Sequence, residues 1–399
     1  MQTYIPRLAE KNLHDGLKSG KIIILLGARQ VGKTTLLKHT LKGESTLFLN
    51  LDTQVDREKL LKAAAITPSE AIRNLGSPET IVIDEAQRLP EVSRIVKGWF
   101  DYEVSSRIIL SGSSSLDLLD QSAESLTGRN VKIHLPPLLF EEMVRTQNWF
   151  PLFEAARQTD THAFSDQFSP HLLSAMVYGG YPDVFTNDDK PSKLTSLVTD
   201  YLLKDILQIS LVKNPELIQK LLTLLAYQTG SIISTNELAN NLLTSRATIE
   251  KYLDLLEKIY VVFRLPAFSS NPRKEITKGH KMYFWDTGIR NALIGEFSLN
   301  QYRGDIGQMW ENWVVSEFAK RNLLNENLSR LHFWRSQAGS EVDLVIKEIT
   351  GELKAFEIKW SPGKTTKAFT PKYHIPVNLI HRENFINYLL KTPNSAGIP

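Results

Sequence analysis

The feature that most constrains the fold is a short run bounded by glycines near the N-terminus. It reads Gly27-Ala28-Arg29-Gln30-Val31-Gly32-Lys33-Thr34, followed by Thr35. An apolar stretch precedes it and a helical pattern follows it, so that backbone N–H groups and a helix N-terminus can converge on phosphate oxygens. Lys33 offers a positive charge for the β and γ phosphates, and the Thr34 hydroxyl suits Mg²⁺. We therefore predict an ATP and Mg²⁺ site here rather than a surface turn with an incidental lysine.

A second motif lies where another apolar strand ends in two carboxylates. Asp84 and Glu85 directly follow the apolar run Thr80–Ile83. Phosphoryl transfer from a nucleotide needs a carboxylate to hold Mg²⁺ and a group that orients or deprotonates the attacking water. We predict that Asp84 binds Mg²⁺ together with Thr34 and that Glu85 is the general base. Two acidic residues after a strand could also be a structural cap, but their position after the phosphate-binding run favours catalysis.

Three further side chains are candidates for contact with the γ-phosphate. Ser111 and Ser113 follow the apolar run Arg107–Leu110, where a polar strand end can contact the nucleotide or the attacking water. The same serines could instead cap the helix that begins near Leu116. Arg129 comes after that helix and could reach the nucleotide of a neighbouring subunit in a homo-oligomer, or form a surface ion pair.

Up to Leu135, short apolar runs alternate with helical stretches, which predicts an α/β fold with a parallel sheet. The expected strands are Lys21–Leu26, Thr46–Leu51, Thr80–Ile83, Arg107–Leu110 and Val131–Leu135. A stretch without clear periodicity, Asn148–Pro170, then interrupts the pattern and predicts a boundary. Helical spacing follows to about Leu256, and short β-like runs with one helix occupy the rest of the chain.

Composition excludes several classes of protein. The chain has no cysteine, so it can form neither a disulfide framework nor a thiolate metal site, and we expect it in the cytoplasm. No apolar run reaches the roughly 18 residues that a membrane-spanning helix needs. The net charge of +3 is too small to identify a polyanionic partner, so any case for DNA must rest on local clusters.

These motifs together resemble bacterial and archaeal AAA-superfamily ATPases that carry a C-terminal domain of unknown function. The resemblance covers nearly the whole chain and rests on Gly27–Thr35, Ile81–Gln87, Leu110–Ser115, Leu126–Arg129, Gly179–Pro182 and a C-terminal acidic pattern. It implies an additional-strand P-loop core and the use of ATP. It implies no particular pathway.

The middle of the chain resembles a winged helix-turn-helix. Two short helices are expected at Ser234–Ala239 and Thr244–Leu256, and the second would carry the exposed residues Ser245, Arg246, Thr248 and Lys251. In DNA-binding versions of this fold the second helix enters the major groove. The basic run Asn271–Lys281 follows and could contact a phosphate backbone. The alternative is a solvated loop and a winged helix that contacts protein.

The C-terminal acidic pattern predicts two paired strands, Glu341–Ile346 and Ala355–Trp360. Because opposed residues of a hairpin share a face, a loop with an odd number of residues would bring Asp343, Glu357 and Lys359 together. Carboxylates that hold Mg²⁺ and a lysine that orients water are suited to phosphodiester cleavage. The spacing resembles the restriction-endonuclease-like core, in which Glu311 would be an accessory acid. The alternative is an ordinary hairpin with its charges in water.

Four domains are therefore expected: a P-loop ATPase domain (1–150), a helical lid (151–215), a winged-helix-like module (216–270) and a restriction-endonuclease-like domain (271–399). One hypothesis is an ATPase that acts on DNA and also cleaves it with Mg²⁺. The other is an ATP-dependent regulatory switch whose nuclease-like domain binds without cutting. The two hypotheses differ in the role of the carboxylates Asp343 and Glu357, which would hold Mg²⁺ for cleavage in the first and would not catalyse cleavage in the second.

Overall fold

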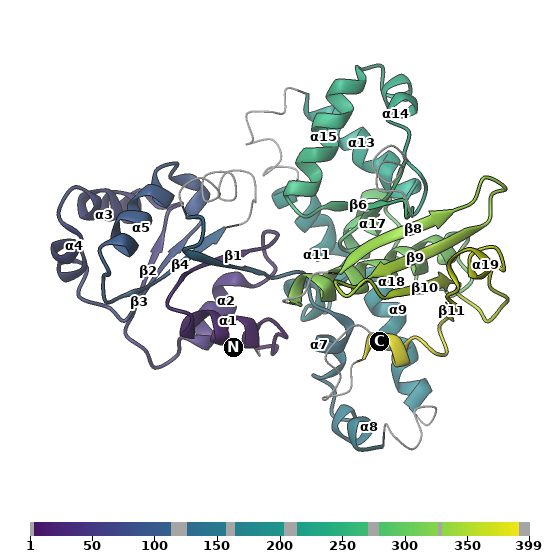
Figure 1. Cartoon of the computed structure of the whole chain (residues 1–399), viewed down its shortest axis with the longest axis horizontal. Coiled ribbons are helices and arrows are strands. Elements are labelled where there is room, and N and C mark those ends of the chain that lie inside the picture. Colours follow the sequence, from purple (N-terminus) through teal and green to yellow (C-terminus); the bar gives the residue numbers. More distant parts are fainter. Residues whose placement is uncertain are drawn as a thin grey trace. The chain divides into compact units, whose positions relative to one another are not determined.

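The structure, a computed structural model, describes residues 4–112, 126–156, 164–202, 214–269, 279–325 and 329–390. The chain divides into two compact units (Figure 1). Unit 1 comprises Met1–Pro136 with Lys258–Tyr260, and unit 2 comprises Pro137–Glu257 with Val261–Pro399. Unit 1 ends before residue 150, the predicted end of the ATPase domain, and the four-domain division stays a prediction.

Unit 1 is built on a five-stranded parallel sheet. Its strands are β1 (Ile22–Leu26), β2 (Thr46–Asn50), β3 (Thr80–Asp84), β4 (Arg107–Gly112) and β5 (Asn130–His134). They lie in the order β2-β3-β4-β1-β5, and each neighbouring pair is parallel. The predicted strands and the parallel sheet are confirmed. Strand β4 lies between β1 and β3, as the implied additional-strand core requires.

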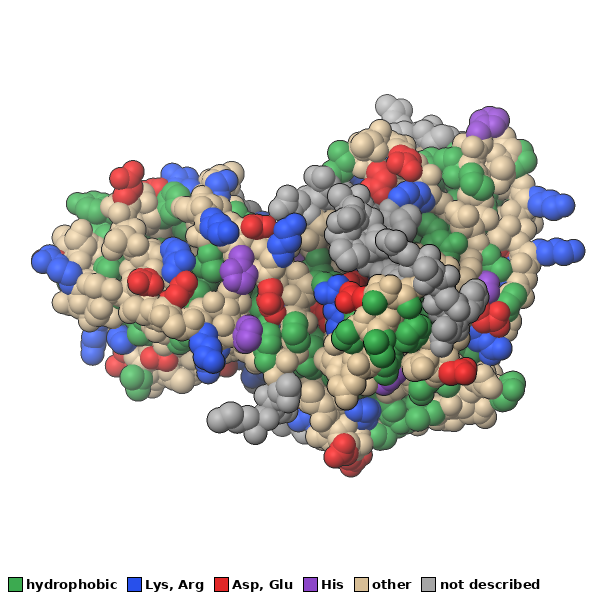
Figure 2. All heavy atoms as spheres, turned by 90° about the horizontal axis from the view of Figure 1, so that it is seen from below, with side chains coloured by type: hydrophobic (Ala, Val, Ile, Leu, Met, Phe, Trp, Pro, Cys, Tyr) green, Lys and Arg blue, Asp and Glu red, His purple; other side chains and the backbone are tan. Residues whose placement is uncertain are grey.

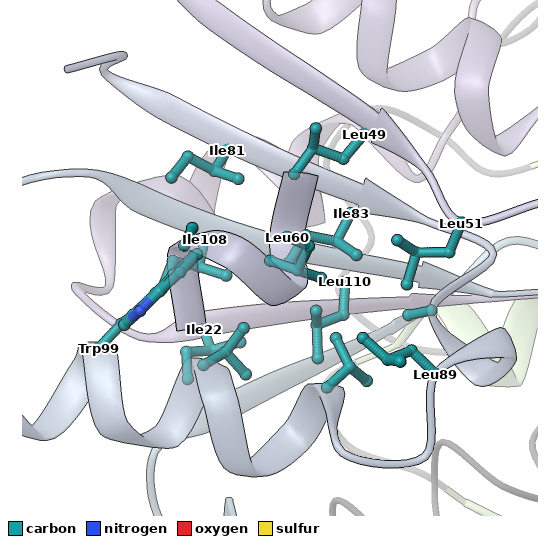
Figure 3. Packing of buried hydrophobic residues seen from close by; sticks show 14 of the residues in the cluster. Ile22, Leu49, Leu51, Leu60, Ile81, Ile83, Leu89, Trp99, Ile108 and Leu110 are labelled. Carbon is teal, nitrogen blue, oxygen red and sulfur yellow. The ribbon is translucent and has the colours of Figure 1, made fainter. Parts of the chain in front are cut away.

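Helices cover both faces of this sheet. They are α1 (Glu10–Lys18), α2 (Lys33–Thr40), α3 (Gln54–Ala64), α4 (Pro68–Asn74), the single turn η1 (Ala86–Arg88) and α5 (Val92–Asp101). On one face, alternate strand residues such as Ile22 and Ile83 pack with Leu60 of α3 and Trp99 of α5 (Figure 3). On the other face, Gly16 of α1 lies against Ile23. A strand covered on both faces must be apolar throughout, which explains the unbroken run in β1.

Unit 2 begins with helices. They are α7 (Phe140–Val144), α8 (Phe150–Ala156), α9 (Ser165–Tyr178), α10 (Pro182–Phe185), α11 (Lys190–Ser196) and the π-helical segment η3 (Leu197–Leu202). Helix α8 and the first turns of α9 lie inside Asn148–Pro170, although the sequence there shows no clear periodicity. Aromatic packing accounts for the difference. The ring centroid of Phe168 lies 4.8 Å from the ring centroids of both Trp149 and Phe153. Large aromatic side chains can pack in this way without a regular helical spacing of apolar residues in the sequence.

Three helices and a strand pair occupy the middle of unit 2. The helices are α13 (Pro215–Tyr227), α14 (Thr235–Asn241) and α15 (Arg246–Lys258), and the strands are β6 (Val262–Pro266) and β7 (His280–Phe284). Strands β6 and β7 pair antiparallel. The two helices predicted from the sequence are present, and the side chain of Ser234 caps α14 by accepting a hydrogen bond from the Glu237 N–H.

The C-terminal part of unit 2 is a four-stranded sheet with a long helix beside it. Its elements are α17 (Thr287–Ile294), α18 (Ile306–Leu324), β8 (Arg330–Arg335), β9 (Glu341–Lys347), β10 (Leu353–Ile358), α19 (Thr370–Tyr373), β11 (Val377–Ile380) and α20 (Ile386–Leu389). The strands lie in the order β11-β10-β9-β8, and only β10 and β11 are parallel. Helix α18 is buried along most of its length, and Phe318 packs against Phe356 of β10.

No helix among the described residues is long and apolar enough to cross a membrane.

Candidate functional site

The phosphate-binding run connects the carboxyl end of β1 to the amino end of α2. Gly32 has a φ of 96°, a left-handed conformation that favours glycine. A Cβ atom at Gly27 would lie 2.2 Å from the carbonyl oxygen of Leu135, which is closer than nonbonded atoms can approach. The backbone path therefore requires glycine at both ends of the motif.

Lys33 lies inside the curve of this loop. Its buried ammonium group donates hydrogen bonds of 2.9 Å to the carbonyl oxygens of Gly27 and Ala28. Gln30 also has a positive φ, 63°, so the loop turns sharply between its two glycines. The other predicted nucleotide-binding positions, Arg29, Val31 and Thr35, complete the same turn and the start of α2. The ammonium group is thus held within the loop, and pairing with a phosphate would require it to leave these two carbonyl groups.

The two acidic residues after β3 lie beside this loop. The hydroxyl of Thr34 donates a hydrogen bond of 2.7 Å to Oδ2 of Asp84, although the two residues are far apart in sequence. A hydroxyl oxygen next to a carboxylate is a pair of ligands that suits Mg²⁺. Glu85 has a φ of 51°, and its Oε2 accepts a hydrogen bond of 2.6 Å from Gln87. The structure thus brings Thr34, next to Lys33, into contact with Asp84, and Glu85 follows Asp84 with its carboxylate bonded to Gln87.

The structure describes two of the three residues predicted to contact the γ-phosphate, Ser111 and Arg129, and they lie at different ends of the sheet. Ser111 pairs with Leu25 of β1 near the end of that strand, and it is fully buried with no hydrogen-bond partner for its Oγ among the described residues. Ser113 lies outside the described residues. Arg129 comes directly before β5, at the amino ends of the parallel strands, whereas the phosphate-binding loop lies at their carboxyl ends. The Arg129 carbonyl accepts a hydrogen bond there from the Ile22 N–H. Its Nε forms an ion pair of 2.6 Å with Asp101, so the surface-pair alternative describes its position in this chain.

Arg7 supports the loop and was not predicted. Its guanidinium donates hydrogen bonds of 2.7 Å to the carbonyl of Val31, within the loop, and 2.6 Å to the carbonyl of Pro136. The side chain is buried, so both bonds are shielded from water. The sequence signal is an arginine among the short run of apolar residues Tyr4–Ala9, and nothing in that run shows which carbonyl groups it meets.

A second charged centre lies in unit 2, around Lys281 of β7. Its buried ammonium group lies 2.9 Å from Oε1 of Glu311 and 3.9 Å from Oδ1 of Asp343, and it also pairs with Glu341. The hydroxyl of Tyr283 donates a further hydrogen bond of 2.6 Å to Glu311. We call these four charged residues the Lys281 centre. The sequence predicted the carboxylates but assigned Lys281 to a surface run on a phosphate backbone, which is wrong because the side chain is only 3% exposed.

The C-terminal hairpin has a loop with an odd number of residues, which is the condition that the prediction set. Phe356 pairs with Leu344 in β9 and β10, which places Glu357 opposite Asp343 across a five-residue loop, Glu348–Glu352. Glu357 and Lys359 form an ion pair of 2.7 Å. Lys359 is partly exposed and bonds to the carbonyl of Lys364, so the lysine among the buried carboxylates is Lys281 and not Lys359.

Burial and charge set the protonation of this centre. Burial raises the pKa of Asp343 to about 7, and the Glu311 carboxylate adds to the rise while Lys281 opposes it. Burial alone would lower the pKa of Lys281, but the carboxylates of Glu311, Asp343 and Glu341 together raise that pKa above its usual range. Lys281 therefore stays protonated at neutral pH.

The predicted Mg²⁺ ligands Glu311, Asp343 and Glu357 do not form a metal site in this arrangement. Within the described ranges, no group of three acidic or histidine side chains is placed to hold a metal ion. Oδ2 of Asp343 accepts a hydrogen bond of 2.7 Å from the Ile358 N–H, and Oε2 of Glu357 accepts one of 2.6 Å from the Thr366 N–H. Each of these two oxygens is thus engaged by a backbone N–H donor.

Helix α15 presents the residues that were predicted to contact DNA. Ser245, Arg246 and Lys251 are exposed, and Thr248 is partly exposed with its hydroxyl 2.9 Å from that of Ser245. Arg246 is paired with Glu250 at 2.7 Å, one turn along the helix. Residues 271–278 of the predicted basic run lie outside the described residues. On the face that Figure 2 shows, Lys and Arg side chains are interspersed with Asp and Glu side chains.

Three family models match successive parts of the chain. Residues 19–144 match an AAA domain, residues 169–300 match a domain of unknown function (DUF8612), and residues 306–390 match another (DUF4143). The first match spans the β1 loop and the end of β3. The sequence match and the sheet order agree that unit 1 contains a P-loop ATPase domain of the AAA type.

Relatives and a solved structure extend the likeness beyond this domain. The chain is 29% identical over 360 residues to an uncharacterized protein of Mycobacterium tuberculosis, covering 88% of this chain and 73% of that protein. It is 26% identical over 408 residues to an uncharacterized protein of Methanocaldococcus jannaschii, covering 98% of this chain and 86% of that protein. A Walker-type ATPase of Pyrococcus abyssi has a similar fold, with a TM-score of 0.50 and 16% identity over 73% of this chain and 96% of that one.

Proposed function

We propose that the protein binds ATP with Mg²⁺ and hydrolyses it at the carboxyl edge of the unit 1 sheet. The observation that supports this most directly is the contact between two distant motifs. The Thr34 hydroxyl at the start of α2 bonds to Asp84 at the end of β3, while Lys33 lies in the adjacent loop. The proposed site thus combines a lysine that would bind phosphate, two side chains that would bind Mg²⁺, and Glu85 as the base.

Each residue has a distinct role in the proposed reaction. Backbone N–H groups of Gly27–Thr35 cradle the phosphates, and the Lys33 ammonium leaves its two carbonyl partners to pair with the β and γ phosphates. Thr34 and Asp84 would hold Mg²⁺, which when bound neutralises phosphate charge. Glu85 orients the attacking water and accepts its proton, and Gln87 holds the Glu85 carboxylate in position.

Lys33→Ala tests this site. We expect the variant to lose ATP binding and phosphate release, because it removes the ammonium group that lies inside the curve of the loop. Binding can be measured by calorimetry and hydrolysis by phosphate release. Thermal unfolding of the nucleotide-free variant is the control for folding. If ATP raises the melting temperature of Lys33→Ala as much as that of the parent, the proposed site is wrong.

We propose as a second function that unit 2 binds DNA through α15. This proposal is supported by the exposed basic residues Arg246 and Lys251 and by the order of α13, α14, α15 and the β6–β7 pair, which is that of a winged helix-turn-helix. Unit 1 would then hydrolyse ATP while unit 2 is bound to DNA. The alternative, a winged helix that contacts protein, predicts no dependence on DNA phosphates.

Neutralising α15 separates these alternatives. Arg246→Ala with Lys251→Ala is expected to weaken binding to duplex DNA and to flatten the plot of log K against log salt by about 2, since each lost phosphate contact removes about 0.9 from the slope. Fluorescence anisotropy over a salt series measures both effects. The matched control is Lys220→Ala on α13, an exposed lysine that is also paired one turn away, with Glu216. Equal slopes for parent and double variant would place DNA elsewhere or exclude it.

For the C-terminal residues we propose the binding role over Mg²⁺-dependent cleavage. Cleavage would require Asp343, Glu357 and Glu311 to release their present donors and gather on a metal, with Lys359 beside the attacking water. The arrangement around Lys281 supports the regulatory alternative, in which this domain binds without cutting. Assembly into a homo-oligomer with Arg129 acting between subunits remains a prediction.

A further inference from the structure

We infer that Lys281 is the resident cation of the C-terminal acidic centre and takes the place that a divalent metal would otherwise occupy. The inference concerns unit 2 and does not depend on ATP hydrolysis in unit 1. It explains why carboxylates predicted to bind Mg²⁺ are instead arranged around an ammonium group.

Carboxylates from two different elements converge on this lysine. Glu311 comes from α18, whereas Glu341 and Asp343 come from the same face of β9. The Lys281 side chain is 3% exposed, and those of Glu311, Asp343 and Glu341 are 18%, 14% and 27% exposed. Partly buried carboxylates this close to one another repel unless a cation lies among them. Lys281 supplies this charge from within the fold, whereas Arg335 approaches only Glu341, at 3.8 Å and from a side chain that is 51% exposed.

The backbone fixes the position of this lysine. Lys281 lies in β7 opposite Leu265 of β6, and it also forms an isolated antiparallel bridge with Ile232. The ammonium group lies 5.7 Å from the ring centroid of Phe333, a further cation–π contact. The backbone of Lys281 is thus held on both sides of its strand, and its ammonium group is held by the carboxylates and by the Phe333 ring.

The neighbouring groups leave little for a metal ion to bind. Oε1 of Glu311 receives both Lys281 and Tyr283, and Oδ2 of Asp343 receives the Ile358 N–H. Gly230 packs on Glu311, since a Cβ atom there would lie 3.2 Å from Oε1. A divalent ion at this centre would have to push the ammonium group away from the carboxylates. Because the displaced ammonium group would stay nearby, repulsion between the two positive charges opposes binding of the ion.

Metal binding by a protein with a disabled ATP site tests the inference directly. In a Lys33→Ala, Asp84→Asn background, we expect no Mn²⁺ bound by electron paramagnetic resonance and no Mn²⁺-dependent rise in melting temperature. Binding of one Mn²⁺ that Asp343→Asn abolishes would overturn the inference.

Removing the lysine tests it independently of metal. Lys281→Met, in nucleotide-free protein, is expected to lower the melting temperature by about 10 °C, because it removes the buried cation from among three partly buried carboxylates. Lys220→Met breaks an exposed Lys–Glu pair on α13, and it is expected to shift the melting temperature by about 2 °C or less. Equal effects of the two substitutions would overturn the inference.

A charge-neutral variant distinguishes lost charge from lost packing and serves where Lys281→Met alone does not fold. Lys281→Met combined with Glu311→Gln and Glu341→Gln removes the cation and two of its partners with little change in shape. We expect this triple variant to fold and to recover at least half of the lost melting temperature. A triple variant no more stable than Lys281→Met would show that Lys281 acts through packing and not as the cation of the centre.

Discussion

Glu85→Gln is expected to keep ATP bound and to lower the rate of hydrolysis by about 10² to 10⁴, the range that a general base contributes. Glutamine has nearly the same shape as glutamate. In the parent Gln87 donates a hydrogen bond to Oε2 of Glu85, and the glutamine side chain can still accept a hydrogen bond from Gln87. It cannot accept a proton from the attacking water. Affinity for ATP depends on Lys33 and the loop, so it should change little. Calorimetric binding and steady-state phosphate release measure the two quantities separately.

Glu91→Gln is the matched control for this prediction. Glu91 is an exposed residue before α5 whose side chain makes no capping hydrogen bond, and its replacement removes the same charge a short distance along the chain. The control should hydrolyse ATP at the parent rate. Hydrolysis by Glu85→Gln at the parent rate would exclude Glu85 as the base. Loss of ATP binding by that variant would instead assign Glu85 a role in holding the nucleotide.

The sequence predicted unit 1 well because its signals are local. The strand β1, the loop and α2 are consecutive, and the glycines that the backbone requires are visible in the sequence itself. The parallel order of the strands then follows from the alternation of apolar runs and helices. The support that Arg7 gives to Val31 and Pro136 was missed, because a hydrogen bond to a distant carbonyl leaves no pattern in sequence.

Unit 2 was predicted less well because its important contacts are long-range. The register of β9 and β10 followed from parity and short spacing. The position of Lys281 did not, because β7 and β9 are separated by α17, α18 and β8. A basic run reads as a surface feature when only neighbours are considered. In the fold, one member of that run is buried, and carboxylates from α18 and β9 keep it charged.

The motif Gly179-Gly180-Tyr181-Pro182 shows the same limit in another place. It identified the family resemblance without indicating a chemistry. In the structure the Gly180 N–H donates a hydrogen bond of 2.6 Å to Oδ2 of Asp286, and its carbonyl accepts one of 2.7 Å from the Leu138 N–H. A Cβ atom at Gly180 would lie 2.3 Å from the carbonyl oxygen of Leu138. The glycine is thus explained by close backbone packing within unit 2.

A buried ion pair near this contact joins α18 to the chain that follows unit 1. Lys320 Nζ lies 3.0 Å from Oε1 of Glu317, and the two side chains are 3% and 2% exposed. The other oxygen of Glu317 accepts a hydrogen bond of 2.9 Å from the Phe140 N–H at the start of α7. Lys320 also approaches the carbonyl of Leu138 at 3.4 Å. The pair therefore satisfies backbone groups of the segment 138–140 as well as its own charges.

Lys320→Met is expected to destabilise unit 2 by about 3 to 5 kcal/mol, because it leaves the Glu317 carboxylate buried without its cation. Lys320→Met with Glu317→Gln should recover much of this loss, since the glutamine is neutral and its carbonyl oxygen can still accept from Phe140. Urea denaturation followed by tryptophan fluorescence measures the change, and Trp310 and Trp313 on α18 provide the signal.

The control for this last prediction is Lys220→Met, which breaks an exposed Lys–Glu pair of 2.6 Å on α13. Its side chains are 61% and 74% exposed, so water already screens the pair and the expected loss is below about 1 kcal/mol. If the two lysine variants lose equal stability, burial does not set the strength of the Lys320 pair. If the double variant is less stable than Lys320→Met, Glu317 stabilises the fold through its charge even without Lys320, and Arg321, its neighbour on α18, would be the next cation to test.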